Sequence, residues 1–130
     1  MSEFLKQAAL VFLGAGTGGV ARFAIGEAAR GLFPAAAERF PWPTLLINVT
    51  GCAAIGLLAP MLKGDAKLVL IVGVLGGYTT FSAFGREVVD LWARGATVGA
   101  AAYVALSVTL GIGASAAGAW IAGANAASPA

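Results

Sequence analysis

The sequence predicts an all-α membrane protein with four transmembrane helices in each subunit. Of its 130 residues, 59% are hydrophobic and only 11% are charged, whereas a soluble domain carries about a quarter charged residues. The mean hydropathy of +0.88 agrees with this class. Four apolar segments, each near the roughly 20 residues that cross a bilayer, take up most of the chain. Because the loops are short and no internal repeat is evident, we expect a single integral membrane domain over residues 1–130.

The first helix is expected at residues 4–33 and the second at residues 43–62. The first segment has no basic leader, and its apolar run is too long for a cleavable signal peptide, so we expect it to span the membrane. Gly14 and Gly18 form a small-xxx-small pair that permits close helix approach. Pro43 suits the start of the second helix.

The third helix, expected at residues 66–92, has a weak point where three glycines precede two threonines. We therefore expect it to be broken near Gly76–Thr80. In hydrocarbon every backbone N–H and C=O needs a partner, so a break is tolerated only where protein buries it or where it lines a wet cavity. Free carbonyls there can hold a cation, and free N–H groups and hydroxyls can hold an anion. The motif therefore predicts an ion site.

The fourth helix is expected at residues 96–123 and carries a stripe of hydroxyl groups. Tyr103, Ser107 and Ser115 fall on one face, and Gly111 fills the i+4 series between them. A stripe at this spacing is either a polar track or a set of hydrogen bonds between helices. The residues alone leave both interpretations open.

Lysine and arginine are balanced between the two expected sides of the membrane. Each side carries three: Lys6, Lys63 and Lys67 on one, and Arg30, Arg39 and Arg94 on the other. Orientation follows the Lys/Arg bias of short loops, and here there is almost none. Two interpretations remain open. Either subunits insert both ways and form an antiparallel dual-topology homodimer, or other features fix one orientation.

Polar side chains within the second and third segments are candidates for an anion site. The amide of Asn48 is costly in lipid unless it faces protein or water. It either joins helices or donates hydrogen bonds to an anion beside residues 79–82, since its NH₂ group has two donors. The hydroxyls of Thr79, Thr80 and Ser82 either donate in the same way or bond back to a helix carbonyl.

Two phenylalanines accompany these donors. Phe81 and Phe84 share a helix face because they are three residues apart. They either pack against neighbours or turn their ring edges, which carry partial positive charge, toward an anion.

Charged side chains stand near the segment ends. Arg22 is the deepest, and we expect it to hold the broken third helix or to draw anions into a vestibule. The others are expected to snorkel to the interface: Glu27, Arg86, Glu87 and Asp90.

Composition also argues against several classes of function. The chain has no histidine and one cysteine, which excludes a Ser–His or Cys–His pair, a zinc site containing histidine and an internal disulfide. We therefore expect no enzyme activity. Cys52 lies in an apolar run and is expected to be a small buried packing residue. The formal net charge of +2 is too small to suggest nucleic-acid binding.

Three blocks of the sequence resemble the Fluc/CrcB family of fluoride channels: residues 18–23, residues 44–51 and residues 76–84. Members of this family are four-helix subunits that form dual-topology dimers with two pores. The resemblance implies that the fluoride path is lined by Asn48, Thr80, Phe81, Ser82 and Phe84. It further implies that Tyr103, Ser107 and Ser115 match the polar track of the family.

The resemblance also implies a cofactor. The backbone carbonyls of Gly76 and Thr79 from both subunits would hold one structural Na⁺ at the dimer centre. The sequence departs from the family pattern at Gly111, where the track usually has a hydroxyl, and at Ala83, where threonine is usual.

The expected function is a passive, fluoride-selective channel in the bacterial inner membrane that exports fluoride and relieves its toxicity. The alternative is a small dual-topology exporter of organic cations driven by protons. It would need a membrane-embedded carboxylate, and Glu27 and Glu87 lie near segment ends. A third possibility is a structural assembly subunit without transport of its own.

Overall fold

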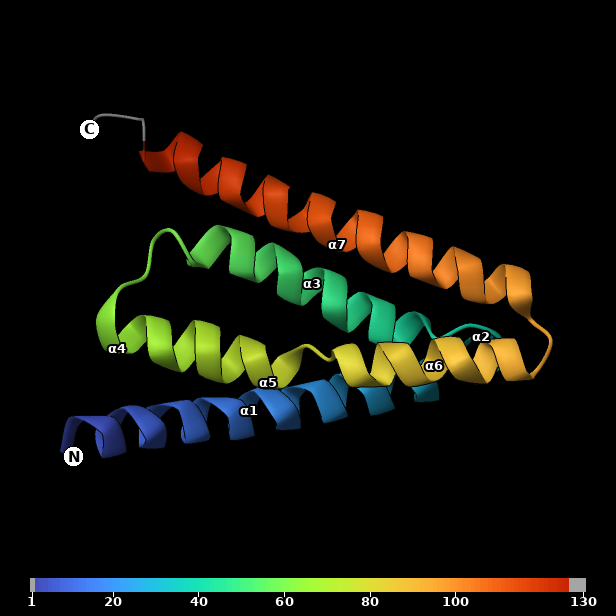
Figure 1. Cartoon of the computed structure of the whole chain (residues 1–130), viewed down its shortest axis with the longest axis horizontal. Helices are drawn as coiled ribbons and strands as arrows, with labels where there is room; N and C mark the ends of the chain where they lie inside the picture. Colours follow the sequence, from blue (N-terminus) through green and yellow to red (C-terminus); the bar gives the residue numbers. More distant parts are fainter. Residues whose placement is uncertain (1, 127–130) are drawn as a thin grey trace.

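The computed structural model describes residues 2–126, with side-chain surroundings through residue 123. All regular elements in this part are helical, which confirms the expected class. Three helical stretches are long and apolar enough to cross a membrane by length and composition: Ser2–Leu32, Gly64–Ala93 and Thr97–Gly123. With a shorter apolar helix they form a bundle of four helical segments that run alternately in opposite directions, so the first and last described residues lie at the same end of the bundle (Figure 1).

The helix bounds follow the expectations closely, with two differences. Helix α1 (Ser2–Leu32) ends before Phe33, and a short helix α2 (Pro34–Arg39) follows, with proline in its first turn. Helix α3 (Trp42–Leu58) ends four residues before the expected position. The last helix, α7 (Thr97–Ala126), begins one residue after the expected start of the fourth segment and extends past its expected end.

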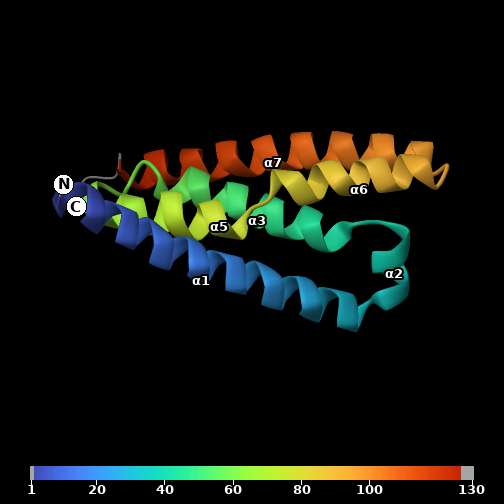
Figure 2. The same cartoon turned by 60° about the horizontal axis from the view of Figure 1, so that its bottom comes forward.

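The third segment consists of four pieces. Helix α4 (Gly64–Lys67) leads into η1 (Leu68–Leu75), which has π-helical hydrogen bonding, and then into α5 (Gly76–Tyr78). Helix α6 (Phe81–Ala93) begins after two extended residues. Thr79 has φ −80° and ψ 157°, and Thr80 has φ −150° and ψ 115°. The expected break is therefore confirmed but narrower, because the two glycines before Tyr78 stay helical. Figure 2 shows the extended link between α5 and α6.

Helix α1 packs closely along η1 and α5 through small residues. A Cβ on Gly14 would lie 2.9 Å from the Gly73 Cα, and one on Gly18 would overlap the Val74 carbonyl. A Cβ on Gly77 would in turn overlap the Ala15 backbone. We call this contact the glycine seam. It confirms that the small-xxx-small pair in the first segment lets two backbones approach each other.

A second tight contact joins α3 to α7. A Cβ on Gly56 would overlap the Ser115 carbonyl, and one on Gly118 would lie 2.5 Å from the Ala53 carbonyl oxygen. Toward the other end of α7, a small apolar core lies between α3, α6 and α7. That core contains Leu91, Ala100 and Tyr103, with Phe40, Leu45, Phe84 and Val88 packed around it.

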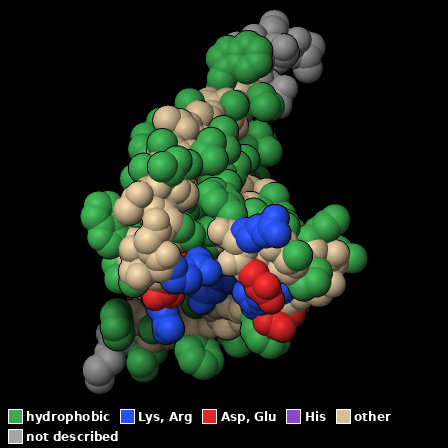
Figure 3. Space-filling model, turned by 90° about the vertical axis from the view of Figure 1, so that its right-hand side faces the viewer, with side chains coloured by type: hydrophobic (Ala, Val, Ile, Leu, Met, Phe, Trp, Pro, Cys, Tyr) green, Lys and Arg blue, Asp and Glu red, His purple; other side chains and the backbone are tan. Residues whose placement is uncertain are grey.

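The two ends of the bundle each hold three of the basic residues considered for topology. At the end where α1 begins and α7 ends, Lys6 Nζ lies 2.6 Å from Asp65 Oδ2. At the other end, the Arg94 guanidinium donates to the Glu38 carbonyl at 3.1 Å. Side chains of both charges gather on that second end (Figure 3). The expected distribution of lysine and arginine is confirmed, whereas the orientation in a membrane stays a prediction.

Candidate functional site

The break between α5 and α6 is clamped by one amide from α3. Asn48 Oδ1 accepts a hydrogen bond from the Thr80 backbone N–H at 2.8 Å, and Asn48 Nδ2 donates to the Thr80 carbonyl at 3.0 Å. The amide thus satisfies both backbone groups of one extended residue, as a neighbouring strand would. This confirms that Asn48 joins helices. Because one Nδ2 hydrogen is not used in these bonds, donation to an anion stays a prediction.

An arginine from α1 supports the residue before this clamp. Arg22 Nη1 donates to the Thr79 carbonyl at 3.3 Å, and the Thr79 hydroxyl bonds back to the Leu75 carbonyl at 3.0 Å. Arg22 is half-buried. Arg22 thus contacts the broken helix, where it was expected to hold it, and the back-bonded form of Thr79 is the one observed.

The start of α6 is capped by Thr80. Its hydroxyl accepts from the Ala83 backbone N–H at 3.2 Å, an N-cap that satisfies a donor in the first turn. The Thr80 and Ser82 hydroxyl oxygens lie 3.2 Å apart. Thr80 therefore has two tasks, since its backbone is held by α3 while its side chain starts the next helix.

A cavity of about 260 Å³ opens beside the break, between α3, α6 and α7. We call it the break cavity. Its lining residues are Asn48, Cys52, Ile55, Thr79, Thr80, Phe81, Phe84, Ser107 and Val108. Five residues proposed for the fluoride path from the sequence meet here: Asn48, Thr80, Phe81, Phe84 and Ser107. The structure thus brings amide, hydroxyl and aromatic groups from three helices to one space.

Two of the candidate residues differ in how well the chain covers them. The rings of Phe81 and Phe84 have centroids 5.5 Å apart with planes at 46°. The Phe84 ring also packs against Tyr103, with the two ring centroids 5.2 Å apart, whereas Phe81 is 83% exposed. Phe84 is thus a packing residue as well as a cavity wall, while Phe81 has little cover from its own chain.

Glu87 was missed as a site residue, because it was expected to snorkel to the interface. Its carboxylate instead turns inward: Oε1 accepts from the Thr44 hydroxyl at 2.7 Å and Oε2 accepts from the Tyr103 hydroxyl at 2.6 Å. The reason is that α6 places it one turn after Phe84, on the side that faces α3 and α7. That i, i+3 spacing from Phe84 is the signal that the sequence offered.

The hydroxyl stripe on α7 is not one open track. Tyr103 is fully buried and its hydroxyl donates to Glu87. The Ser107 Oγ atom is buried and, within the described part of the chain, has no hydrogen-bond partner. Farther along, Cys52 lies over Gly111, and the backbone of Ser115 packs on α3. Hydrogen bonding between helices explains Tyr103. Of the three hydroxyl residues in the stripe, Ser107 is the one that lines the break cavity.

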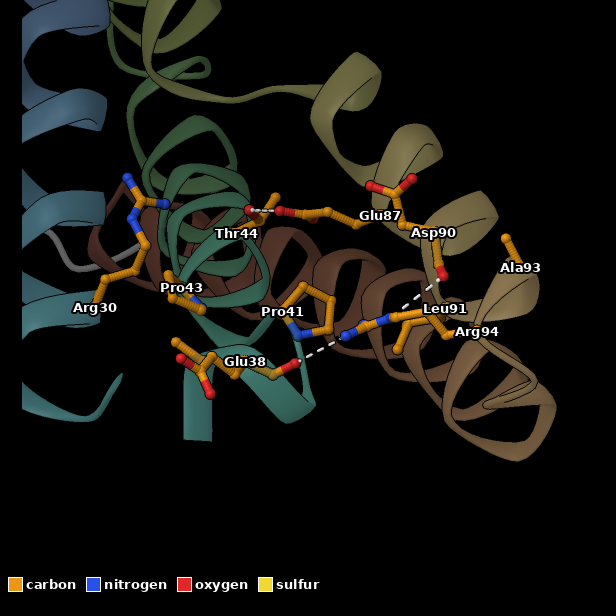
Figure 4. Close-up of a pocket in the computed structure, with 11 residues that line it drawn as sticks. Arg30, Glu38, Pro41, Pro43, Thr44, Glu87, Asp90, Leu91, Ala93 and Arg94 are labelled. Carbon is orange, nitrogen blue, oxygen red and sulfur yellow. Dashed lines mark hydrogen bonds between the residues drawn. The ribbon is translucent and has the colours of Figure 1, made fainter. Parts of the chain in front are cut away.

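Larger hollows lie toward the end of the bundle that carries α2. One of about 600 Å³ is bordered by Arg22, Arg30 and Arg86, together with Ser82 and Glu87. Another of about 500 Å³ lies next to it, where Arg94 bonds to the carbonyls of Glu38 and Asp90 (Figure 4). The arginines border a region that an anion could approach.

The other charged residues behave as expected. Glu27 is exposed and forms an ion pair with Arg30. Arg86 and Asp90 are also exposed, and Arg86 Nε lies 3.5 Å from Asp90 Oδ2. These side chains thus lie on the surface, in contrast to Glu87.

The carbonyls implied as cation ligands lie at the same break. In a continuous α-helix the Gly76 carbonyl would accept the Thr80 N–H, which here goes to Asn48 instead. The Thr79 carbonyl accepts from Arg22 and, having two lone pairs, keeps one for another partner. The residues present fit a cation held by backbone oxygens.

The comparison with known proteins identifies the family. The model of the family described as "CrcB-like protein, Camphor Resistance (CrcB)" matches residues 9–119. The chain belongs to the CrcB family. The resemblance noted from the three sequence blocks is thereby confirmed.

Relatives in this family carry a functional name. The chain is 44% identical over 118 residues to a protein from Rhizobium johnstonii, covering 86% of this chain and 92% of that protein. It is 41% identical over 119 residues to one from Coxiella burnetii, covering 86% and 90%. It is 46% identical over 110 residues to one from Chelativorans sp., covering 76% and 88%. Each of the three is named "Fluoride-specific ion channel FluC".

Proposed function

We infer that this multi-pass membrane protein is a passive channel for fluoride, which lets the ion leave the bacterial cytoplasm across the inner membrane. The observation that carries this function is the break cavity, where Asn48, Thr80 and Ser107 meet two phenylalanine rings. The names of its relatives support the choice of ion.

The chemistry of the cavity suits a small, strongly hydrated anion. A pore must replace the water around the ion with donors, yet hold the ion weakly enough to release it. Amide and hydroxyl hydrogens and the positive edges of aromatic rings meet both demands without a full cationic charge in the narrow part. The arginines lie instead beside the wider hollow toward the end of the bundle.

The test is fluoride release from liposomes that contain the purified protein. Vesicles are loaded with potassium fluoride, valinomycin balances the charge, and an electrode records fluoride outside. We expect rapid release of fluoride, and little release of chloride from matched vesicles. Release no faster than from protein-free vesicles would overturn the proposed function.

The same assay separates the channel from a proton-driven exporter. An exporter of organic cations would release no fluoride in this assay, whereas a channel releases fluoride along its gradient and a protonophore leaves the rate unchanged. The exporter would need a carboxylate that exchanges substrate for protons, and both Glu87 oxygens are already engaged by hydroxyl donors. The relatives' names do not support the exporter either.

We further propose that two copies pair in opposite orientations. Three lysines near one end of the bundle face three arginines near the other, Arg30, Arg39 and Arg94, when Arg22 and Arg86 within the helices are left out, and this balance supports insertion both ways. The exposed ring of Phe81 at the break leaves a wall for a partner copy to complete. A C-terminal tag should be accessible from both sides of the membrane in about equal amounts, and a tag found on one side only would contradict this assembly.

A structural Na⁺ on the two-fold axis belongs to the same proposal. The Gly76 and Thr79 carbonyls of two copies would hold it, as an isologous contact uses the same residues twice. Such an ion would supply positive charge against carbonyls that lose helical partners at the break. Protein prepared with N-methylglucamine in place of Na⁺ should lose dimer stability and efflux, and unchanged values after verified removal would rule out this ion.

A further inference from the structure

The hydroxyl stripe of α7 has a gap at Gly111, and a side chain from another helix covers it. A Cβ placed on Gly111 would have one neighbour within 4 Å in the described part of the chain, the Cys52 Sγ atom at 3.5 Å. That distance is ordinary van der Waals contact. The thiol from α3 thus occupies the space next to the position where the α7 stripe has no side chain.

The thiol also lines the break cavity. Cys52 follows Asn48 by one helical turn on α3, and both residues border that space together with Ser107. Cys52 is half-buried, so its side chain is neither enclosed in the core nor turned fully outward. Its place is next to the clamp that holds the break.

The Ser107 hydroxyl, unpartnered within the part of the chain that the structure describes, is an independent indication that the break cavity holds water or an anion. The Ser107 hydroxyl oxygen is buried and has no partner among the described residues. Leaving such a group unsatisfied is costly, and native structures usually satisfy it with protein, water or an ion. Because Ser107 lines the break cavity one turn before Gly111, water or an anion in that cavity is the partner within reach.

We propose that Cys52 is a pore-lining residue whose S–H group takes the place of the hydroxyl missing at Gly111. This inference rests on the proposed fluoride channel and adds one polar group to its conduit. A thiol is a weak, uncharged donor, which suits a wall that must release the ion again. The expected role of Cys52 as a packing residue is extended, since the same side chain also borders the cavity.

Because Cys52 is the only cysteine in the chain, wild-type protein reports on this position directly. Ag⁺ is a small thiol reagent: a sulfur–silver bond forms and the S–H proton leaves to solvent. In nitrate buffer, Ag⁺ should reach a thiol in a wet conduit and lower fluoride efflux at least about tenfold, reversibly on adding dithiothreitol. The matched control, Cys52→Ser, keeps an uncharged donor but has no thiol, so Ag⁺ should leave its own efflux rate unchanged.

A second experiment moves the polar group back to α7. Cys52→Gly removes the donor and should lower efflux about fivefold, the effect of losing one modest hydrogen bond. Gly111→Ser alone adds a hydroxyl against the thiol and should also lower efflux, because the space is already filled. The double variant Cys52→Gly/Gly111→Ser should recover to within about twofold of wild type, which is the non-additivity expected of contacting residues.

A readout that does not depend on fluoride keeps this inference separate from the proposed function. Protein in liposomes is exposed to Ag⁺, washed, denatured and treated with a maleimide, so that only thiols that silver did not reach are labelled. Protection of Cys52 supports its place in a wet conduit, whatever ion wild-type protein conducts. Full maleimide labelling, or unchanged efflux in Cys52→Gly while wild type conducts fluoride, would overturn the inference.

Discussion

The glycine seam and the break cavity lie on two sides of the same broken helix, and different forces hold them. At the seam, α1 touches η1 and α5 through backbone atoms, with glycines where a Cβ would collide. At the cavity, α6 is positioned by hydrogen bonds from Asn48, Arg22 and Thr80. One side is closed by shape alone, while the other is held open by a few polar contacts.

This difference shows how a membrane protein can keep non-helical backbone in the bilayer. Lipid offers no hydrogen bonds, so every group freed at the break must find a protein partner. The seam fixes η1 and α5 rigidly, because close-packed backbones have no alternative arrangement. Asn48 can then pair with both backbone groups of Thr80 and leave a cavity beside them.

The largest effect is expected from filling the seam. Gly18→Leu would drive a side chain into the Val74 carbonyl and should destabilise the protein by about 3 kcal/mol or more, measured as loss of folded protein in detergent on heating. Gly16→Leu is the matched control, since a Cβ there meets nothing within 4 Å among the described residues. Equal melting temperatures for the two variants would show that the seam is not tightly packed.

The next effect concerns the clamp. In Asn48→Asp, one carboxylate oxygen still accepts from the Thr80 N–H, but the other faces the Thr80 carbonyl, so two acceptors meet. We expect fluoride efflux to fall at least about tenfold and stability to fall by about 1–3 kcal/mol.

A control for the clamp exists on α7. Among the described residues, the Thr109 hydroxyl donates to the Ala105 carbonyl of its own helix and to no other helix, so Thr109→Ala should change neither quantity. An Asn48→Asp variant that is folded and conducts like wild type would remove Asn48 from both the clamp and the pore.

A smaller effect should separate the two phenylalanines. Phe84→Ile loses the tilted ring contact with Tyr103, worth about 0.5–1.5 kcal/mol, so both stability and efflux should fall. Phe81→Ile affects a ring that is 83% exposed, so efflux should fall with little change in stability. Melting and efflux measured on the same preparations distinguish these outcomes, and normal conduction in both variants would mean that the rings only pack.

The smallest effect is expected far from both regions. Lys6 and Asp65 form an ion pair in which both side chains are about half exposed. Water and salt weaken such a pair, so Asp65→Asn should shift the melting temperature by no more than about 2 °C. A larger shift in melting temperature would mean that the Lys6–Asp65 pair adds to the stability that we assign to the glycine seam.

Much of this architecture could be predicted from local patterns. The apolar segments gave the helices to within a few residues, and three glycines before two threonines located the break. The π-helical hydrogen bonding of η1 could not be foreseen, because residues 68–75 are apolar and suit an ordinary helix equally well. The inward carboxylate of Glu87 was missed for a similar reason: its hydroxyl partners lie on two other helices.

The sequence by itself determined which polar groups would lie in the membrane, because hydropathy depends only on the order of residues. It did not determine their partners. Asn48 meets Thr80 across 32 positions and Arg22 meets Thr79 across 57, and such pairs form only when packing brings helices together. Cys52 and Gly111 make the same point, since only the contact between α3 and α7 places a thiol where the α7 stripe lacks a side chain.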